Sequence, residues 1–210
     1  MDSRPYLPWT DGALRPAALV RVLNEIVFAD RRDVVELGSG ASTVVLARLL
    51  NERGGRLTSV EHSPEWAAIV RTQLESEGLT EVARLVEAPL AEHPLGWDGA
   101  EWYSAPALDE LPRSGIDLLL VDGPPGYGEG TARSRFPALP VLAERLAPGA
   151  LVILDDLQRQ GEREIVERWG REMPEWEFGV DADTGIAIGH LPDLGPKQGG
   201  RSEGRIEEDG

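Results

Sequence analysis

The sequence predicts an α/β fold with a mostly parallel sheet, and three observations carry that prediction. Apolar runs alternate with helical patterns through most of the 210 residues, an order typical of strand-helix-strand units. The runs are continuously apolar, as in Ile116-Asp-Leu-Leu-Leu-Val121, which indicates strands buried on both faces of a parallel sheet. No shift in composition divides the body of the chain, so we expect one main domain over residues 31–191.

Five apolar runs predict the parallel strands, at residues 33–37, 56–61, 82–88, 116–122 and 150–155. Four stretches with helical periodicity lie between or after them, at residues 42–50, 64–77, 137–146 and 162–172. Ser63 and Pro64 mark a helix start, because serine caps the first turn and proline suits the first helical position. Residues 176–180 and 185–190 predict a closing antiparallel hairpin.

The two ends of the chain differ from this body. Residues 1–30 are predicted to form a cap segment that contains an amphipathic helix over residues 14–27. From residue 192 to residue 210 the chain is rich in Gly, Pro and charged side chains. Such a segment buries too little apolar surface to offset the entropy of ordering, so we expect a disordered polar tail.

Composition excludes several classes of function. The net charge of -16 argues against a nucleic-acid partner, because phosphate binding needs clustered Lys and Arg. The chain shows neither a long apolar run nor a signal peptide, so we expect a cytoplasmic protein with no membrane partner. Lys197, in the polar tail, is the only lysine, and there is no cysteine. Schiff-base enzymes, P-loop NTPases and lysine-dependent dehydrogenases are therefore excluded, as is thiolate chemistry.

The segment Val34-Val-Glu-Leu-Gly-Ser-Gly-Ala-Ser-Thr43 is the most informative of the chain. A strand breaks into the glycine turn Gly38-Ser-Gly40, where backbone N–H groups and the next helix N-terminus can approach a ligand. Glu61 ends the following strand, about 20 residues on, where a carboxylate typically accepts hydrogen bonds from a ribose. The pair predicts a nucleoside-bearing cofactor. Thr43 stands where a dinucleotide motif has a third small residue, so that motif is incomplete.

On these residues the chain resembles class I S-adenosylmethionine-dependent methyltransferases, and within them the catechol O-methyltransferase-like small-molecule group. The resemblance runs from about residue 33 to about residue 168. Four further segments support the resemblance: Thr58-Ser-Val-Glu-His-Ser-Pro64, Leu85-Val-Glu-Ala-Pro89, Leu119-Leu-Val-Asp-Gly-Pro-Pro-Gly126 and Val152-Ile-Leu-Asp-Asp-Leu-Gln-Arg159. It implies a Rossmann-like, seven-stranded sheet completed by the hairpin, with helices on both faces. It also implies methyl transfer from S-adenosylmethionine to a small-molecule acceptor, with oxygen favoured as the acceptor atom.

The resemblance also assigns a cofactor site. Gly38 and Gly40 would pass beneath the methionine part, Ser42 would bind its carboxylate, and Glu36 would hold the turn or the amino group. Glu61 would take the ribose hydroxyls, with His62 and Ala88 beside the adenine and Asp122 near the sulfonium. The full predicted set is Glu36, Gly38, Ser39, Gly40, Ser42, Glu61, His62, Glu87, Ala88 and Asp122.

Asp122, Asp155 and Asp156 end two strands that we expect to be neighbours. Carboxylates of this kind suit Mg²⁺, and in the resembling enzymes such residues hold a magnesium ion that binds the paired hydroxyls of the substrate. That group carries a lysine where this chain has Gly123-Pro-Pro-Gly126. Two interpretations therefore stay open: metal ligands, or aspartates that serve as cofactor ligand, helix cap and loop anchor. Asp122, Asp155 and Tyr103 are the predicted catalytic residues.

The substrate side is predicted from loops. Arg133, Arg135 and Arg159 would either grip an anionic substrate or neutralise the nearby carboxylates. Trp102 and Tyr103 would form an aromatic wall or anchor a loop, and the resemblance places Tyr6 and Trp9 at the substrate mouth. Two other functions remain open: a non-catalytic cofactor-binding module and an NAD(P)-dependent oxidoreductase. The sequence also leaves the oligomeric state open, a homodimer included.

Overall fold

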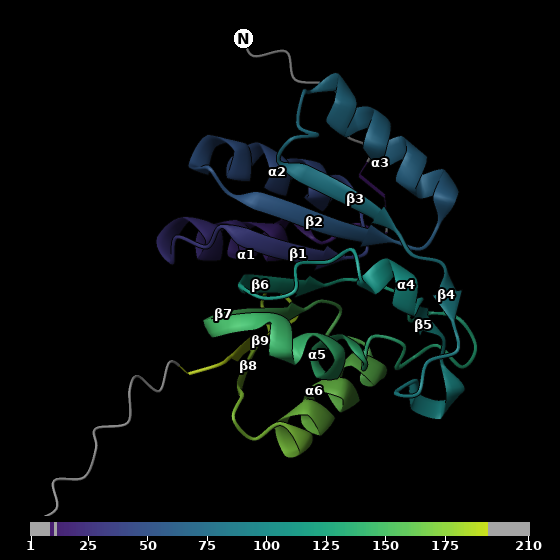
Figure 1. Cartoon of the computed structure of the whole chain (residues 1–210). Coiled ribbons are helices and arrows are strands. Elements are labelled where there is room, and N and C mark those ends of the chain that lie inside the picture. The colour runs from purple at the N-terminus through teal and green to yellow at the C-terminus, as the bar shows by residue number, and fades with distance from the viewer. Residues whose placement is uncertain (1–8, 11, 193–210) are drawn as a thin grey trace, which may run out of the picture.

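A computed structural model describes residues 9–10 and 12–192 of the protein. Seven strands form one sheet in the order β3-β2-β1-β6-β7-β9-β8 (Figure 1). The strands of this sheet are β1 (Asp33–Leu37), β2 (Arg56–Glu61), β3 (Ala83–Glu87), β6 (Ile116–Val121), β7 (Leu146–Leu154), β8 (Glu177–Asp181) and β9 (Ile186–His190). The helices are α1 (Pro16–Phe28), α2 (Ala41–Arg53), α3 (Pro64–Ser76), α4 (Ala105–Leu108), α5 (Ala138–Leu142) and α6 (Gln160–Glu172).

The strand order reverses between β1 and β6. From β1 the chain runs outward through β2 to β3, and it then returns to pair β6 with the other side of β1. These pairs and the pair of β6 with β7 are parallel, whereas β9 and β8 close the sheet as an antiparallel hairpin. In an open parallel sheet such a reversal opens a crevice at the carboxyl ends of the two strands, and ligands bind there.

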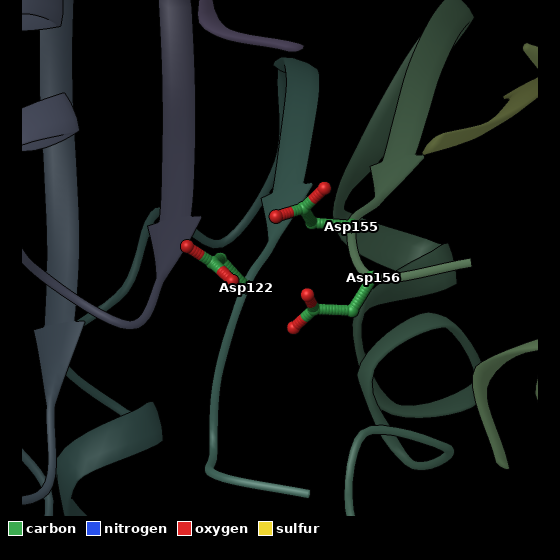
Figure 2. A group of neighbouring side chains, drawn as sticks. All are labelled: Asp122, Asp155 and Asp156. Atoms are coloured by element: carbon green, nitrogen blue, oxygen red, sulfur yellow. The ribbon is translucent and has the colours of Figure 1, made fainter. Parts of the chain in front are cut away.

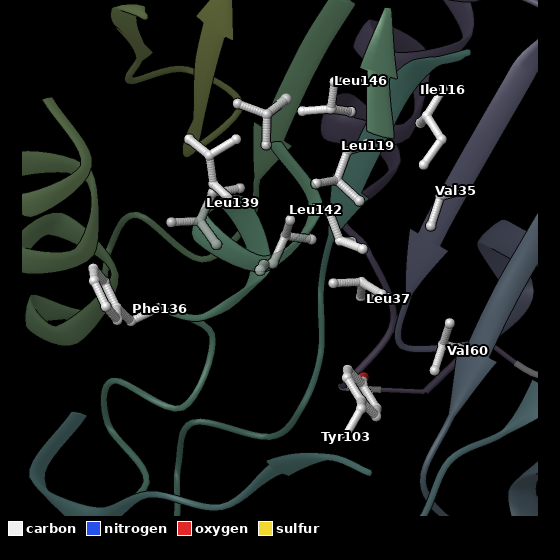
Figure 3. Packing of buried hydrophobic residues seen from close by; sticks show 14 of the residues in the cluster. Val35, Leu37, Val60, Tyr103, Ile116, Leu119, Phe136, Leu139, Leu142 and Leu146 are labelled. Atoms are coloured by element: carbon white, nitrogen blue, oxygen red, sulfur yellow. The ribbon is translucent and has the colours of Figure 1, made fainter. Parts of the chain in front are cut away.

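Alternate side chains of the strands divide between two layers of helices. Val34, Leu118 and Ile153 pack on one face with buried residues of α1, α2 and α3. On the other face, Val35 and Leu119 pack with residues of α4, α5 and α6 (Figure 3). This burial on both faces accounts for the continuous apolar runs of the sequence.

The predicted Rossmann-like, seven-stranded sheet with its C-terminal hairpin is confirmed. Ser63 caps α3 as expected, since its side chain accepts a hydrogen bond from the Trp66 N–H. The helix predicted over residues 137–146 is shorter than expected. It ends as a short turn, η2 (Ala143–Arg145), and β7 begins at Leu146, which pairs with Ile116. Pairing with the sheet overrides the local apolar pattern at that point.

A small second sheet was not predicted from the sequence. It pairs β4 (Leu90–Ala91) with β5 (Trp102–Tyr103), and the turn η1 (Trp97–Gly99) lies between them. Strands of two residues are too short to show any periodicity. Within the described part of the chain, no helix has both the length and the apolar composition that crossing a membrane requires. Tyr6 and most of the predicted tail, residues 193–210, lie outside the described residues.

Candidate active site

The crevice between β1 and β6 is built from two loops in backbone contact. The Gly38 N–H donates to the Val60 carbonyl (2.9 Å), and the Asp122 N–H donates to the Leu37 carbonyl (2.9 Å). Gly38 has a φ of 94°, and a Cβ placed on it would lie 2.9 Å from the Gly123 nitrogen. Both the left-handed backbone and the lack of space therefore require glycine at this bend.

A cavity of about 400 Å³ opens over these loops, which is a size common for small-molecule sites. Residues from several parts of the chain line it: the segment before α1, the β1–α2 turn, the end of β2 with the start of α3, the loop after β6, and the loop after β7. They are Thr10, Gly12, Ala13, Leu14, Gly38, Ser39, Gly40, Ala41, Ser42, Glu61, His62, Ser63, Trp66, Asp122, Gly123, Pro125, Tyr127, Arg135, Asp156 and Arg159.

Glu36 lies beneath the glycine turn and is fully buried. Its carboxylate accepts three hydrogen bonds of 2.6 Å, from the hydroxyls of Ser42, Thr43 and Ser59. Burial raises the pKa of Glu36, and these hydroxyl donors oppose the shift. Of the two roles predicted for Glu36, the contacts match the one that holds the turn, because they tie β1 to α2 and β2.

Glu61 faces the cavity from the end of β2, with only 3% of its surface exposed. One carboxylate oxygen accepts from the N–H (3.1 Å) and hydroxyl (2.8 Å) of Ser39, and the other accepts from the Ser63 N–H (2.8 Å) and lies 2.9 Å from His62 Nδ1. Burial works against ionisation of Glu61, but the bonds from His62, Ser63 and Ser39 outweigh it and lower its pKa. The carboxylate is thus held ionised at the wall of the cavity.

Three aspartates meet on the opposite wall, after β6 and β7 (Figure 2). One oxygen each from Asp122, Asp155 and Asp156 lies within 4.8 Å of the others. Burial raises the pKa of Asp122 well above its usual value. The positive charge of Arg135 lowers this pKa in part, and the neighbouring aspartates raise it further. Asp122 and Asp156 line the cavity, whereas Asp155 lies behind them, and its Oδ1 has no partner among the described residues.

Comparison with known proteins decides the family. The chain matches the family model described as a methyltransferase domain over residues 35–157, more than half of its length. The protein belongs to the methyltransferase domain family. The class I methyltransferase predicted from the sequence is therefore confirmed. No curated protein sequence matches the chain.

Solved structures share the fold of this methyltransferase at low sequence identity. An O-methyltransferase from Bacillus cereus in complex with SAH has a TM-score of 0.62 and 20% identity, covering 87% of this chain and 84% of its own. TomG, an O-methyltransferase from Streptomyces achromogenes involved in tomaymycin synthesis, in complex with SAM, has a TM-score of 0.60 and 17% identity, covering 87% and 82%. A putative caffeoyl-CoA O-methyltransferase from Staphylococcus aureus has a TM-score of 0.64 and 14% identity, covering 88% and 86%.

The predicted arginines of the methyltransferase are engaged in ion pairs. Arg135 reaches Asp122 and Asp156, and Arg159 reaches Asp156 (2.8 Å) and Glu162 (3.5 Å). Both line the cavity. Arg133 does not line it: this side chain pairs with Asp98 and Glu164 and lies over the Trp97 ring. The contacts match neutralisation of carboxylates, one of the two predicted roles.

Trp102 and Tyr103 lie in the core rather than at the cavity wall. Both are fully buried, and their rings meet edge to face. A Cβ placed on Gly123 would lie 2.5 Å from the Tyr103 hydroxyl, so this phenol sits directly beneath the loop after β6. Burial, together with the charge of Glu61, raises the pKa of Tyr103 well above its usual value. Its contacts match an anchor for that loop.

Three further predicted residues do not line the cavity. Ala88 is fully buried, and Glu87 is exposed and pairs with Arg71. Neither lines the cavity, whereas Gly38, Ser39, Gly40, Ser42, Glu61 and His62 all do. Trp9 is 40% exposed and also lies outside the lining.

Trp66 lines the cavity but is not among the site residues predicted from the sequence. Its indole N–H donates to the Ser39 carbonyl (2.7 Å), so α3 is tied to the glycine turn. A signal was present, because Trp66 is the third residue after the Ser63 cap and side chains in a first turn point back toward the helix N-terminus. Tyr127, 80% exposed on the loop after β6, adds an aromatic ring to the rim.

Proposed function

We propose that the protein transfers a methyl group from S-adenosylmethionine to an oxygen atom of a small-molecule acceptor. The observation that carries the proposal is the shared cavity: the Gly38–Gly40 turn, Glu61 and Asp122 line one space at the reversal of strand order. The SAH and SAM complexes of proteins with this fold support the choice of cofactor. The O-methyltransferases among the similar structures support oxygen as the acceptor atom.

The residues present fit the cofactor. Gly38, Ser39 and Gly40 line the cavity, and the bare backbone of such a glycine turn allows close approach of the methionine part. The ionised Glu61 carboxylate can accept hydrogen bonds from a ribose diol. The Ser39 hydroxyl and the His62 ring contact this carboxylate in the structure and would have to move aside for the ribose. Asp122 lines the opposite wall of the same cavity, which is the place expected for the residue beside the sulfonium.

When bound, S-adenosylmethionine supplies a methyl group on a positively charged sulfur. A lone pair of the acceptor oxygen forms the new O–C bond while the S–C bond breaks and its electron pair stays on sulfur. We assign Asp122 as the base that takes the acceptor proton. Asp156 is already engaged by Arg135, Arg159 and Gln158, whereas among the described residues the Asp122 carboxylate is contacted by Arg135. The protein otherwise positions the two reactants.

A magnesium ion does not fit the residues around the three aspartates. The carboxylate oxygens match the chemistry that Mg²⁺ prefers. The guanidinium of Arg135, however, already lies 3.3 Å from Asp122 Oδ1 and 3.1 Å from Asp156 Oδ2. Two of the three aspartates are thus already paired with the Arg135 guanidinium. The proposed reaction therefore contains no metal step.

The test is methyl transfer to a panel of phenols, hydroxy acids and amines, followed by mass spectrometry of the methylated product and of S-adenosylhomocysteine. We expect O-methylation of one acceptor class by wild type. Asp122→Asn should lose turnover while it still binds S-adenosylhomocysteine in calorimetry, and Asp109→Asn, at an exposed position, should match wild type. Binding without transfer to any acceptor would favour a non-catalytic module, and NAD(P) binding in its place would favour an oxidoreductase.

A further inference from the structure

Arg135 occupies an unusual place for a cation, in the interior between two loops of the active site. Its side chain is 4% exposed, and all three guanidinium nitrogens have partners. Nε donates to the Pro124 carbonyl (3.2 Å), and Nη2 donates to the carbonyl (2.5 Å) and the carboxylate (3.3 Å) of Asp122. Nη1 lies 3.1 Å from the Asp156 carboxylate and 3.4 Å from the Asp155 carbonyl. One side chain thus joins the loops that follow β6 and β7.

The guanidinium contacts the carboxylates of two of the three aspartates that could hold a metal, Asp122 and Asp156. Oxygens on opposite sides of one magnesium ion lie about 4.2 Å apart, twice the usual bond length. The three aspartate oxygens fall within 4.8 Å of each other, close to that span. A metal held by these aspartates would share the Asp122 and Asp156 carboxylates with the guanidinium, and two cations that close repel strongly in a buried site.

The charges around Arg135 also account for its burial. Asp122, Asp155, Asp156 and Glu162 supply four carboxyl groups, and Arg135 and Arg159 supply two guanidiniums against them. Asp155 Oδ1 has no partner among the described residues and is buried. It is the oxygen that an added cation would recruit if the guanidinium were removed.

We propose that Arg135 is a built-in cation that stands in place of a divalent metal, so that the aspartates are held for catalysis without one. This inference rests on the proposed methyl transfer and deepens it. Arg135 is a positioning residue: it fixes Asp122 and Asp156 at the cavity wall, and Asp122 touches the acceptor.

The experiment is a titration of the protein with Mn²⁺, read by the electron paramagnetic resonance signal of the free ion, with S-adenosylhomocysteine present. Wild type should leave Mn²⁺ free, and EDTA should leave its turnover unchanged. Arg135→Met keeps the length of the side chain without its charge and should bind Mn²⁺ about tenfold more tightly or better, because a contacting cation is gone. Adding Asp155→Asn to that variant should remove the binding.

Arg135→Lys is the matched control, because it keeps one positive charge at the same place and should leave Mn²⁺ free. Circular dichroism and S-adenosylhomocysteine binding show whether each variant is folded. Wild type that binds Mn²⁺, and loses it on Asp155→Asn, would overturn the proposal. A folded Arg135→Met protein that leaves Mn²⁺ free would overturn it too. Failure of the proposed methyl transfer would appear separately, as wild type that neither binds S-adenosylhomocysteine nor turns over.

Discussion

The two walls of the cavity hold their carboxylates by different means. On the β1–β2 side, Glu61 lines the cavity and Glu36 lies buried beneath the glycine turn, and both accept hydrogen bonds from hydroxyls, backbone N–H groups or an imidazole. On the β6–β7 wall, Asp122 and Asp156 are paired with guanidiniums. The Glu61 carboxylate is therefore held ionised by hydrogen bonds, whereas guanidiniums neutralise the carboxylates of the second wall. We therefore propose that the first wall binds the cofactor and that the second wall faces the acceptor oxygen.

The largest effect is expected from replacing Glu61. Glu61→Gln replaces one acceptor oxygen by an NH₂ group that faces hydrogen-bond donors. The hydrogen bonds that hold this side chain, and the ribose contact proposed for it, should then both be lost. We expect S-adenosylhomocysteine to bind about 100-fold more weakly in calorimetry, which corresponds to two charge-assisted hydrogen bonds at most.

Glu87→Gln is the matched control for Glu61→Gln. Glu87 is the direct neighbour of Glu61 in the sheet register, but it is exposed and pairs with Arg71 outside the cavity. Its replacement should leave the affinity as in wild type. An equal loss in both variants would show that charge at this sheet edge, rather than contact with the ligand, sets the affinity, and the predicted cofactor role of Glu87 would then be supported.

The sequence anticipated the first wall better than the second, for a physical reason. Glu36, Gly38 and Glu61 lie within or directly after the regular strands β1 and β2, and the side-chain hydrogen bonds of Glu36 and Glu61 stay within that strand-helix-strand unit and the turn that follows it. Local spacing therefore predicts their geometry. On the second wall, Arg135 meets Asp122 and Asp156 through loops with no periodic pattern. Composition shows that arginines and aspartates are present there, but it does not show which of them pair.

The same limit applies to the fold. The strands and helices of the main sheet follow from continuous apolar runs and helix caps such as Ser63. The two-residue strands β4 and β5 depend on tertiary packing of Trp102 and Tyr103 in the core, which no local pattern signals. For this reason the sequence alone suggests a catalytic phenol at Tyr103, whereas the buried hydroxyl lies beneath the loop of Gly123.

Stability should depend on pH through the buried Glu36. Burial raises the pKa of Glu36 above its unfolded value of about 4.3. The folded state therefore binds the proton of the Glu36 carboxyl group more tightly than the unfolded state does. The resulting stabilisation is present in full below about pH 4.3 and is lost as the pH rises through the raised pKa. Glu36→Gln has no such proton, so its free energy of unfolding should fall less over this range. Each tenfold difference in proton affinity between the folded and unfolded states corresponds to about 1.4 kcal/mol.

Urea unfolding at a series of pH values measures this slope. Glu87→Gln removes the same charge from an exposed position and should keep the wild-type slope, which isolates the buried carboxyl group from the general effect of net charge. A Glu36→Gln slope identical to that of wild type would mean that the hydroxyls of Ser42, Thr43 and Ser59 fully offset the burial of Glu36.

The smallest expected effect concerns Trp66, which links the first wall to α3. Trp66→Phe keeps an aromatic ring at the cavity and removes the N–H that donates to the Ser39 carbonyl. The loss of one such bond is worth about 1 kcal/mol, so S-adenosylhomocysteine should bind about fivefold more weakly. Trp176→Phe, in the core beside Phe178, should leave the affinity unchanged. If both variants lose affinity equally, the weakening reflects general stability, and the glycine turn is positioned by Glu61 and Glu36 alone.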